Sequence, residues 1–131
     1  MLIDTSGFLC ILDKRDFRHP RAAEYFISAR SRLTHNYVLA ELVALAESRN
    51  FSREITLDFL SDMFEDPQTE IIWVTENLTE RAIIFLRKRN DKEWSLCDAV
   101  SFLLMKEYGI SEALTTDHHF EQAGYVKLLE S

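Results

Sequence analysis

Short apolar runs alternate with longer amphipathic stretches along the 131 residues of this chain. The apolar runs predict strands at 1–5, 32–34, 71–74, 113–116 and 126–129. The amphipathic stretches predict helices over 20–30, 36–49, 52–65, 79–89 and 95–108, with a helical turn over 8–12 and a short helix near 120–122. Parallel strands need crossover connections and cover on both faces. The order therefore predicts a three-layer α/β domain, with about five short strands in a central parallel sheet and helices on both faces.

Individual residues predict where several helices begin and end. Pro20 suits the first turn of a helix. Asn36 and Ser52 are good N-cap residues for the helices that follow them. Gly109 suits the C-terminal end of the helix over 95–108.

Length and composition indicate one compact domain, residues 1–131, with a single site. The hydrophobic content of 47% is enough for a core. The apolar run at Met1–Leu12 is interrupted by Asp4 and has no basic segment or cleavage site, so it does not read as an export signal. No apolar run reaches bilayer length. We therefore expect a soluble, cytoplasmic protein without a membrane partner, and reduced core thiols at Cys10 and Cys97.

The formal net charge of -7 argues against indiscriminate binding to nucleic acid. The charge is regional, however, because residues 58–80 hold seven acids and no Lys or Arg, which leaves the rest of the chain neutral. Basic residues gather at 14–21 and 87–92, where they can guide an anionic polymer. The acidic stretch reads as a solvated helix and loop that face away from RNA, in preference to a docking surface for a basic partner.

Four carboxylates stand at positions that suggest a common site. Asp4 and Asp117 follow predicted strands, and ligands of parallel α/β sheets bind beyond the carboxyl ends of the strands. Glu41 is the only charged residue between Tyr37 and Ala46, and Asp98 is the only one from Trp94 to Met105. Such apolar helices are expected to be buried, where an isolated carboxylate needs a compensating cation.

Local explanations exist for three of the four acids. Asp4 could cap the helical turn that follows it, Asp98 could complete a capping box with Ser95, and Asp117 could cap the short helix near 120–122. Glu41 has no comparable local role. Taken together, the acids predict a site with oxygen ligands for a hard cation such as Mg²⁺ or Mn²⁺. Bound metal should then raise the melting temperature.

Other constellations are weaker. His118 and His119, with His19 and His35, lack the spacing of a zinc motif, and adjacent His side chains are expected to diverge. Trp73 and Trp94 could stack on bases, but core positions are favoured for both. Ser95 lacks the glycine-flanked turn of a serine hydrolase.

Four motifs carry a resemblance to a known family. They are Leu-Ile-Asp-Thr-Ser at 2–6, Leu-Ala-Glu-Leu at 39–42, Ser-Leu-Cys-Asp-Ala at 95–99 and Leu-Thr-Thr-Asp-His-His-Phe at 114–120. Across nearly the whole chain, their order and spacing resemble the PIN-domain nucleases, particularly the VapC-like toxins. The resemblance implies a metal-dependent endoribonuclease with Asp4, Glu41, Asp98 and Asp117 in the acidic positions, of which Asp4 and Asp98 are expected to bind metal directly. It also implies supporting hydroxyl groups at Thr5, Ser6 and Thr116.

The resemblance further implies an RNA substrate, an antitoxin protein as partner and a homodimer. In the expected chemistry, metal-activated water attacks the phosphodiester, and we hypothesise two ions with substrate bound. The alternatives are a PIN ribonuclease of RNA processing and a PIN-like binding module without catalysis. A phosphoacceptor receiver domain is less consistent, because Asp4 has no adjacent acid and Lys127 falls inside the last predicted strand.

Overall fold

A five-stranded parallel sheet forms the centre of the computed structural model, which describes residues 1–131. The strands are β1 (Leu2–Ile3), β2 (Arg32–His35), β3 (Thr69–Ile72), β4 (Glu112–Leu114) and β5 (Val126–Lys127), in the spatial order β3-β2-β1-β4-β5. The helices are α1 (Thr5–Leu12), α2 (His19–Ser28), α3 (Asn36–Ser48), α4 (Arg53–Glu65), α5 (Glu76–Lys88), α6 (Leu96–Tyr108) and α7 (His119–Gln122). The predicted α/β class and parallel sheet are confirmed.

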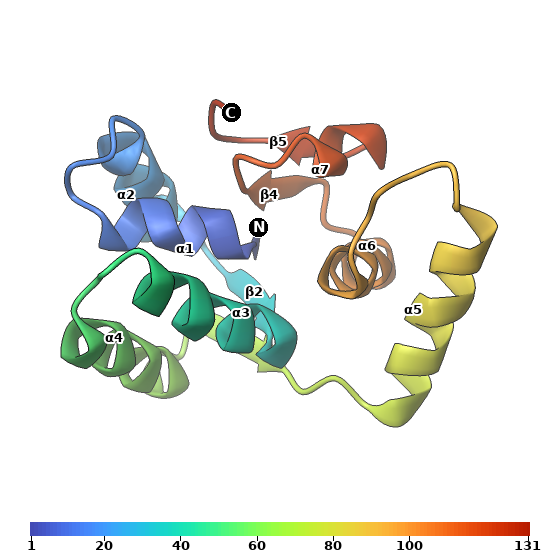
Figure 1. Cartoon of the computed structure of the whole chain (residues 1–131). Coiled ribbons are helices and arrows are strands. Elements are labelled where there is room, and N and C mark those ends of the chain that lie inside the picture. The colour runs from blue at the N-terminus through green and yellow to red at the C-terminus, as the bar shows by residue number, and fades with distance from the viewer.

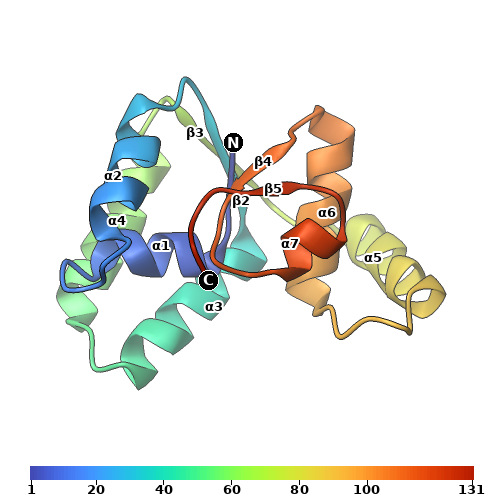
Figure 2. The ribbon, with the colours of Figure 1, turned by 90° about the horizontal axis from the view of Figure 1, so that it is seen from above.

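Helices cover both faces of the sheet and give the predicted three layers. Helices α1 to α4 gather on one side and α5 to α7 on the other (Figure 1). The same division is clear from above (Figure 2). Ile3, Leu42 and Met63 belong to the core of the first side, whereas Leu2 and Phe102 belong to that of the second. Leu2 and Ile3 are adjacent in β1, so their side chains point to opposite faces of the sheet and pack in different cores. No helix is both long and apolar enough to cross a membrane.

Several predicted helix ends are confirmed, but the helix predicted over 79–89 begins earlier, at Glu76 after a Thr75 cap, and the cap predicted at Asn36 is wrong. Ser52 caps α4 by accepting a hydrogen bond from the Ile55 N–H, and Gly109 closes α6 with a φ of 66°. Asn36 does not cap α3, because the chain is already helical there and His35 occupies the cap position. The Asn36 side-chain oxygen instead accepts a 2.6 Å hydrogen bond from the Val74 N–H. It therefore fixes the chain where it leaves β3.

The two tryptophans have different environments. Trp94 is 7% exposed and packs against Phe85 and Phe102, as the core prediction requires. Trp73 is 61% exposed, and its ring stacks in parallel on the exposed ring of Phe64. The core prediction is wrong for Trp73, because β3 lies at the edge of the sheet and ends at Ile72, so Trp73 lies outside the strand that the sequence predicted over 71–74. Cys10 and Cys97 are buried free thiols, as predicted.

The acidic stretch over residues 58–80 consists mostly of exposed side chains, in agreement with its interpretation as a solvated region. Asp66 is the exception, since its carboxylate accepts a 2.6 Å bond from the buried guanidinium of Arg32. That guanidinium also lies over the ring of Phe26. Arg32 thus ties β2 to the turn that precedes β3.

The close approach of α1 to β4 requires a glycine. A Cβ atom on Gly7 would lie 2.1 Å from the carbonyl oxygen of Leu114, a backbone atom that cannot swing away. The Asp4 N–H also donates to the Leu114 carbonyl, at 3.2 Å. The start of α1 is therefore held directly against the end of β4, and this junction positions the acids described next.

Candidate active site

The candidate site lies where the carboxyl ends of β1 and β4 meet. Asp4 follows β1 directly, and Asp117 comes three residues after the end of β4. The chain runs from β1 through α1 and α2 to β2 on one side of β1, whereas β4 on the other side is reached only after four further helices and β3. Ligands of open α/β sheets bind at such a change of direction. We call Asp4, Glu41, Asp98 and Asp117 the acidic cluster.

Asp4 is a nearly buried carboxyl, 5% exposed. It occupies the cap position of α1, but its side chain makes no capping hydrogen bond, so helix capping does not account for it. Its Oδ2 atom accepts hydrogen bonds from the Thr115 hydroxyl at 3.1 Å and the Ser6 hydroxyl at 3.5 Å. Burial, followed by the charge of Asp98, raises the pKa of Asp4 to about 7. A positive charge beside Asp4 would remove this penalty.

Asp98 does complete the capping box that its distance from Ser95 predicts. The Ser95 N–H donates to Asp98 Oδ2, and the Asp98 N–H donates to the Ser95 hydroxyl, both at 3.0 Å. The same Oδ2 atom lies 2.9 Å from Nδ1 of His119. The contact with the Ser95 N–H and the contact with His119 both use Oδ2, so the other carboxylate oxygen of Asp98 is available to bind a metal ion. The residue is 7% exposed. The capping role and a metal role are therefore compatible.

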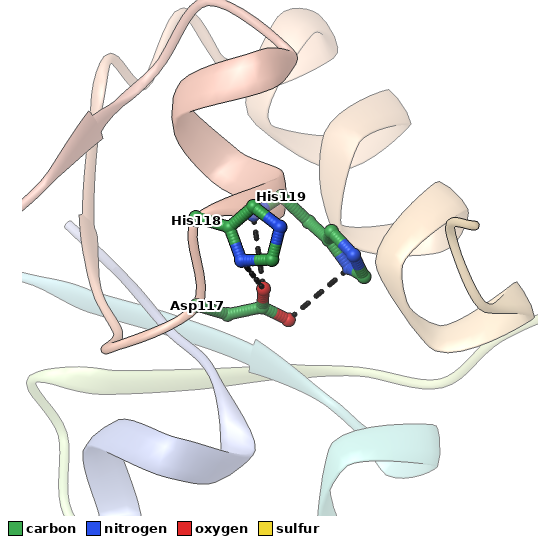
Figure 3. A group of neighbouring side chains, drawn as sticks. All are labelled: Asp117, His118 and His119. Atoms are coloured by element: carbon green, nitrogen blue, oxygen red, sulfur yellow. Dashed lines mark hydrogen bonds and ion pairs between the residues drawn. The ribbon is translucent and has the colours of Figure 1, made fainter. Parts of the chain in front are cut away.

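Two histidines contact the carboxylate of Asp117. Its Oδ1 accepts a 2.9 Å bond from the His119 N–H, which satisfies a donor at the start of α7. Nδ1 of His118 lies 3.7 Å from Oδ1, and Nδ1 of His119 lies 3.4 Å from Oδ2. Both rings thus turn toward one carboxylate (Figure 3). The expectation that these adjacent His side chains diverge is wrong, because His118 precedes α7 and His119 begins it.

Glu41 departs from the sequence argument. The helix α3 buries Val38, Leu39 and Leu42, but Glu41 is exposed together with Ala40 and Ala44. The alanines made this face of α3 look buried in the sequence, but a side chain as small as alanine is tolerated at exposed positions. Burial therefore gives no reason for a cation at Glu41.

Electrostatics nevertheless places Glu41 near the other acids. Its charge is among the causes that raise the pKa of Asp4. Burial, followed by the charges of Asp4, Glu41 and Asp98, also raises the pKa of the Cys97 thiol. The charge of Glu41 thus acts on the same groups as the charges of Asp4 and Asp98, with Glu41 on the solvent side.

Hydroxyl groups connect the acids, although not in the way that the sequence predicts. Thr115 donates to Asp4 Oδ2 and accepts a 3.0 Å bond from the Asp117 N–H. Ser6 lies 3.0 Å from the Thr115 hydroxyl and accepts from the Thr116 N–H at 2.9 Å. Thr116 therefore contributes a backbone donor, and the side-chain link between Asp4 and Asp117 comes from Thr115. The predicted hydroxyl of Thr5 is buried and has no hydrogen-bond partner.

Sequence reasoning missed two members of this network, Thr115 and His119. The Thr-Thr-Asp motif holds two hydroxyls, and only the alternation of side chains after β4 decides which one turns inward. His119 was weighed only as a zinc ligand. It begins α7, where its ring reaches Asp98 on the facing helix α6. A His two residues after an Asp that closely follows a strand is the signal that could have indicated it.

The residues present fit a divalent cation. Asp4 and Asp98 each receive their side-chain hydrogen bonds on a single oxygen, and the Thr5 hydroxyl is an unpaired buried oxygen nearby in sequence. Such a set of carboxylate and hydroxyl oxygens suits a hard ion, Mg²⁺ or Mn²⁺, better than a soft one. Close carboxylates without a cation repel one another, in agreement with the raised pKa of Asp4.

Comparison with known proteins decides the family. The model of the PIN domain matches residues 1–125 of the chain. The chain belongs to the PIN-domain family. Two relatives, both named 23S rRNA-specific endonuclease VapC20, come from Mycobacterium tuberculosis strains CDC 1551 / Oshkosh and ATCC 25618 / H37Rv. Each is 30% identical over 129 residues, which cover 98% of this chain and 97% of the relative.

A solved structure of a PIN-domain relative has the same fold. The crystal structure of Mycobacterium tuberculosis VapC20, described as a sarcin-ricin loop cleaving toxin, matches with a TM-score of 0.86 and 27% sequence identity. The match covers 98% of both chains. The predicted membership of the PIN family and the predicted likeness to VapC toxins are therefore confirmed.

Proposed function

We propose that this PIN-domain chain is a divalent-metal-dependent endoribonuclease and the toxin of a toxin-antitoxin pair. The observation that carries the proposal is the meeting of Asp4, Asp98 and Asp117 at the ends of β1 and β4, in a chain that matches the PIN domain from residue 1 to 125. Relatives that cover nearly the whole chain are named as endonucleases specific for 23S rRNA. The catalytic set we propose is Asp4, Glu41, Asp98 and Asp117.

The proposed roles follow from the position of each acid. Asp4 and Asp98 are the direct ligands of Mg²⁺ or Mn²⁺, because each is nearly buried and fixed through one oxygen only. When bound, such an ion lowers the pKa of a water molecule and offsets negative charge on the phosphoryl oxygens. Exposed Glu41 faces the side from which RNA and water arrive, and it orients the attacking water. Asp117 completes a second metal position or acts through water.

The surrounding hydrogen bonds support this arrangement. Thr115 fixes the unligated oxygen of Asp4, and Ser95 and His119 fix that of Asp98. Ser6 in turn orients Thr115. Such partners keep ligand oxygens in place and reduce the reorganisation needed when metal binds.

The proposed substrate is structured RNA, with the sarcin-ricin loop of 23S rRNA as the first candidate, because the relatives are named as 23S rRNA-specific endonucleases and the matched structure is a sarcin-ricin loop cleaving toxin. The proposed partners are an antitoxin protein that blocks the acidic cluster and a second copy of the chain in a homodimer. The resemblance to VapC toxins supports both partners. Light scattering of the purified protein would test the dimer.

The central experiment measures metal-dependent cleavage of a sarcin-ricin loop RNA. The wild-type protein should cleave it with Mg²⁺ or Mn²⁺ and stop when a chelator is added. Asp98→Asn keeps the size of the side chain but removes its charge, and it should lower the cleavage rate more than about a hundredfold, beyond the usual effect of losing an outer-shell group. Asp91→Asn, at an exposed carboxylate paired with Arg89, is the matched control and should cleave normally.

Two outcomes would count against the proposal. Cleavage that is equal in the wild type and in Asp98→Asn would show that the acidic cluster is not catalytic. RNA that is bound but left intact with both metals would favour a binding module. For the toxin role, expression of the wild type should arrest growth, Asp4→Asn should not, and a small adjacent gene should restore growth; an active but harmless enzyme would favour RNA processing.

A further inference from the structure

His118 and His119 bring nitrogen ligands to the edge of the acidic cluster, whose four acids offer only oxygen. One ring nitrogen of each histidine and a carboxylate oxygen of Asp117 all lie within 4.8 Å of one another. Imidazole nitrogen is a ligand preferred by Zn²⁺, Cu²⁺ and Ni²⁺, whereas Mg²⁺ is held by oxygen. We propose that Asp117, His118 and His119 form a second metal site, selective for a borderline transition-metal ion such as Zn²⁺, and that its occupation inhibits the nuclease.

The distances suit a zinc ion held by three protein ligands. Zn–N and Zn–O bonds of about 2.0–2.2 Å place neighbouring tetrahedral ligands about 3.4 Å apart. Nδ1 of His119 lies 3.4 Å from Oδ2 of Asp117, and Nδ1 of His118 lies 3.7 Å from Oδ1 of the same carboxylate. Figure 3 shows the two rings beside this carboxylate. One ion would bring the three ligand atoms closer than the 4.8 Å within which they now lie.

All three proposed ligands are accessible to an ion from solvent. The His118 side chain is 66% exposed, Asp117 is 29% exposed and His119 is 21% exposed. Three protein ligands with an open side leave the fourth position to water, as in open zinc sites. The site therefore differs from the nearly buried pair Asp4 and Asp98 in both ligand type and access.

Inhibition follows from two residues that the site shares with the catalytic arrangement. A zinc ion would take the carboxylate of Asp117 away from the acidic cluster. It would also occupy the Nδ1 atom of His119, which at present faces Oδ2 of Asp98 at 2.9 Å. The hydrogen bond that fixes Asp98 would then be lost. The effect on cleavage rests on the proposed function, but zinc binding itself does not.

Direct measurements of zinc binding test the second metal site separately from the proposed nuclease function. With excess Mg²⁺ present to occupy the acidic cluster, Zn²⁺ titration by calorimetry and Co²⁺ absorption in the visible region, a probe of nitrogen coordination, should each show a site that needs both histidines. His118→Ala removes an exposed ligand that has no place in the catalytic arrangement. It should weaken Zn²⁺ binding by at least ten- to a hundredfold, the range known for lesser, outer-shell changes. Glu121→Gln, which removes a nearby exposed charge but no ligand, is the control and should bind like the wild type.

Activity provides the second readout. With Mg²⁺ present, zinc should inhibit RNA cleavage by the wild type at concentrations that leave His118→Ala active, and both should cleave equally without zinc. Asp4→Asn should still bind zinc although it cleaves nothing. Equal zinc affinity in the wild type and His118→Ala would overturn the second site. Zinc binding by a wild type that cleaves no RNA would overturn only the proposed nuclease function.

Discussion

Replacing Asp4 with Asn should make the metal-free protein more stable at neutral and alkaline pH. The Asp4 carboxyl is 5% exposed, and its pKa is raised from 3.8 to about 7, first by burial and then by Asp98. Asn keeps the shape, and its oxygen can still accept the hydrogen bond from Thr115. The variant therefore removes the unfavourable charge while the surrounding contacts remain.

The magnitude follows from the shift between the unfolded and folded pKa values. Because the folded pKa is raised, the folded protein holds the proton more tightly, so this stability is full below pH 3.8 and is lost as the pH rises toward 7. At about 1.4 kcal/mol per pKa unit, the ionised carboxyl lowers the free energy of unfolding by on the order of 4 kcal/mol above neutral pH. From about pH 5 to about pH 8, the stability difference between Asp4→Asn and the wild type should grow by about 2–3 kcal/mol.

Urea denaturation with a chelator present, repeated across this pH range, measures the difference. Groups that titrate in both proteins cancel when the two curves are subtracted. Asp91→Asn, at an exposed carboxyl whose pKa is lowered by Arg89, should give no such growth with pH. Added Mg²⁺ should stabilise the wild type and have little effect on Asp4→Asn. A difference curve that stays flat between acid and alkaline pH would refute the electrostatic account of Asp4.

Three further predictions concern packing, backbone anchoring and catalysis. Gly7→Ala should lower the free energy of unfolding by about 3 kcal/mol or more in a denaturant titration, because its Cβ would lie 2.1 Å from the Leu114 carbonyl oxygen. Asn36→Ala should lower it by about 1–2 kcal/mol in the same titration, since the Val74 N–H loses its acceptor; no change would mean that water replaces the side chain. Glu41→Gln should leave the melting temperature unchanged, because the side chain is exposed, but should slow RNA cleavage by on the order of ten- to a hundredfold. Cleavage at the wild-type rate would exclude Glu41 from the catalytic set.

The sequence was sufficient for the order of the elements because the signals for it are local. Ser52 and Gly109 mark helix ends through their own hydrogen bonds and backbone conformation. Asn36 misled because the same side-chain oxygen that can cap a helix can also accept from a distant N–H, here that of Val74. Trp73 misled because the position of β3 at the edge of the sheet depends on tertiary pairing.

The candidate site was predicted at the level of its acids but not of its supporting contacts. Asp98 is nearly buried, as the argument from isolated charge requires, whereas Glu41 lies on an exposed alanine-rich face. The contacts of Thr115 and His119 join residues far apart in sequence, and a one-residue change of position or a different ring rotation would abolish them. Tertiary packing determines these contacts, and a local sequence pattern does not predict them.

The junction of β1 with β4 also affects when the site can form during synthesis. Asp4 leaves the ribosome well before Asp117 and the α7 residue that contacts Asp98. The central strand β1 gains its neighbour β4 only after β2, β3 and the helices between them have been made. A partial chain therefore carries the acids but not their arrangement. If the protein cleaves ribosomal RNA, the ribosome that makes it is exposed to an assembled active site only after the residues up to α7 have been made.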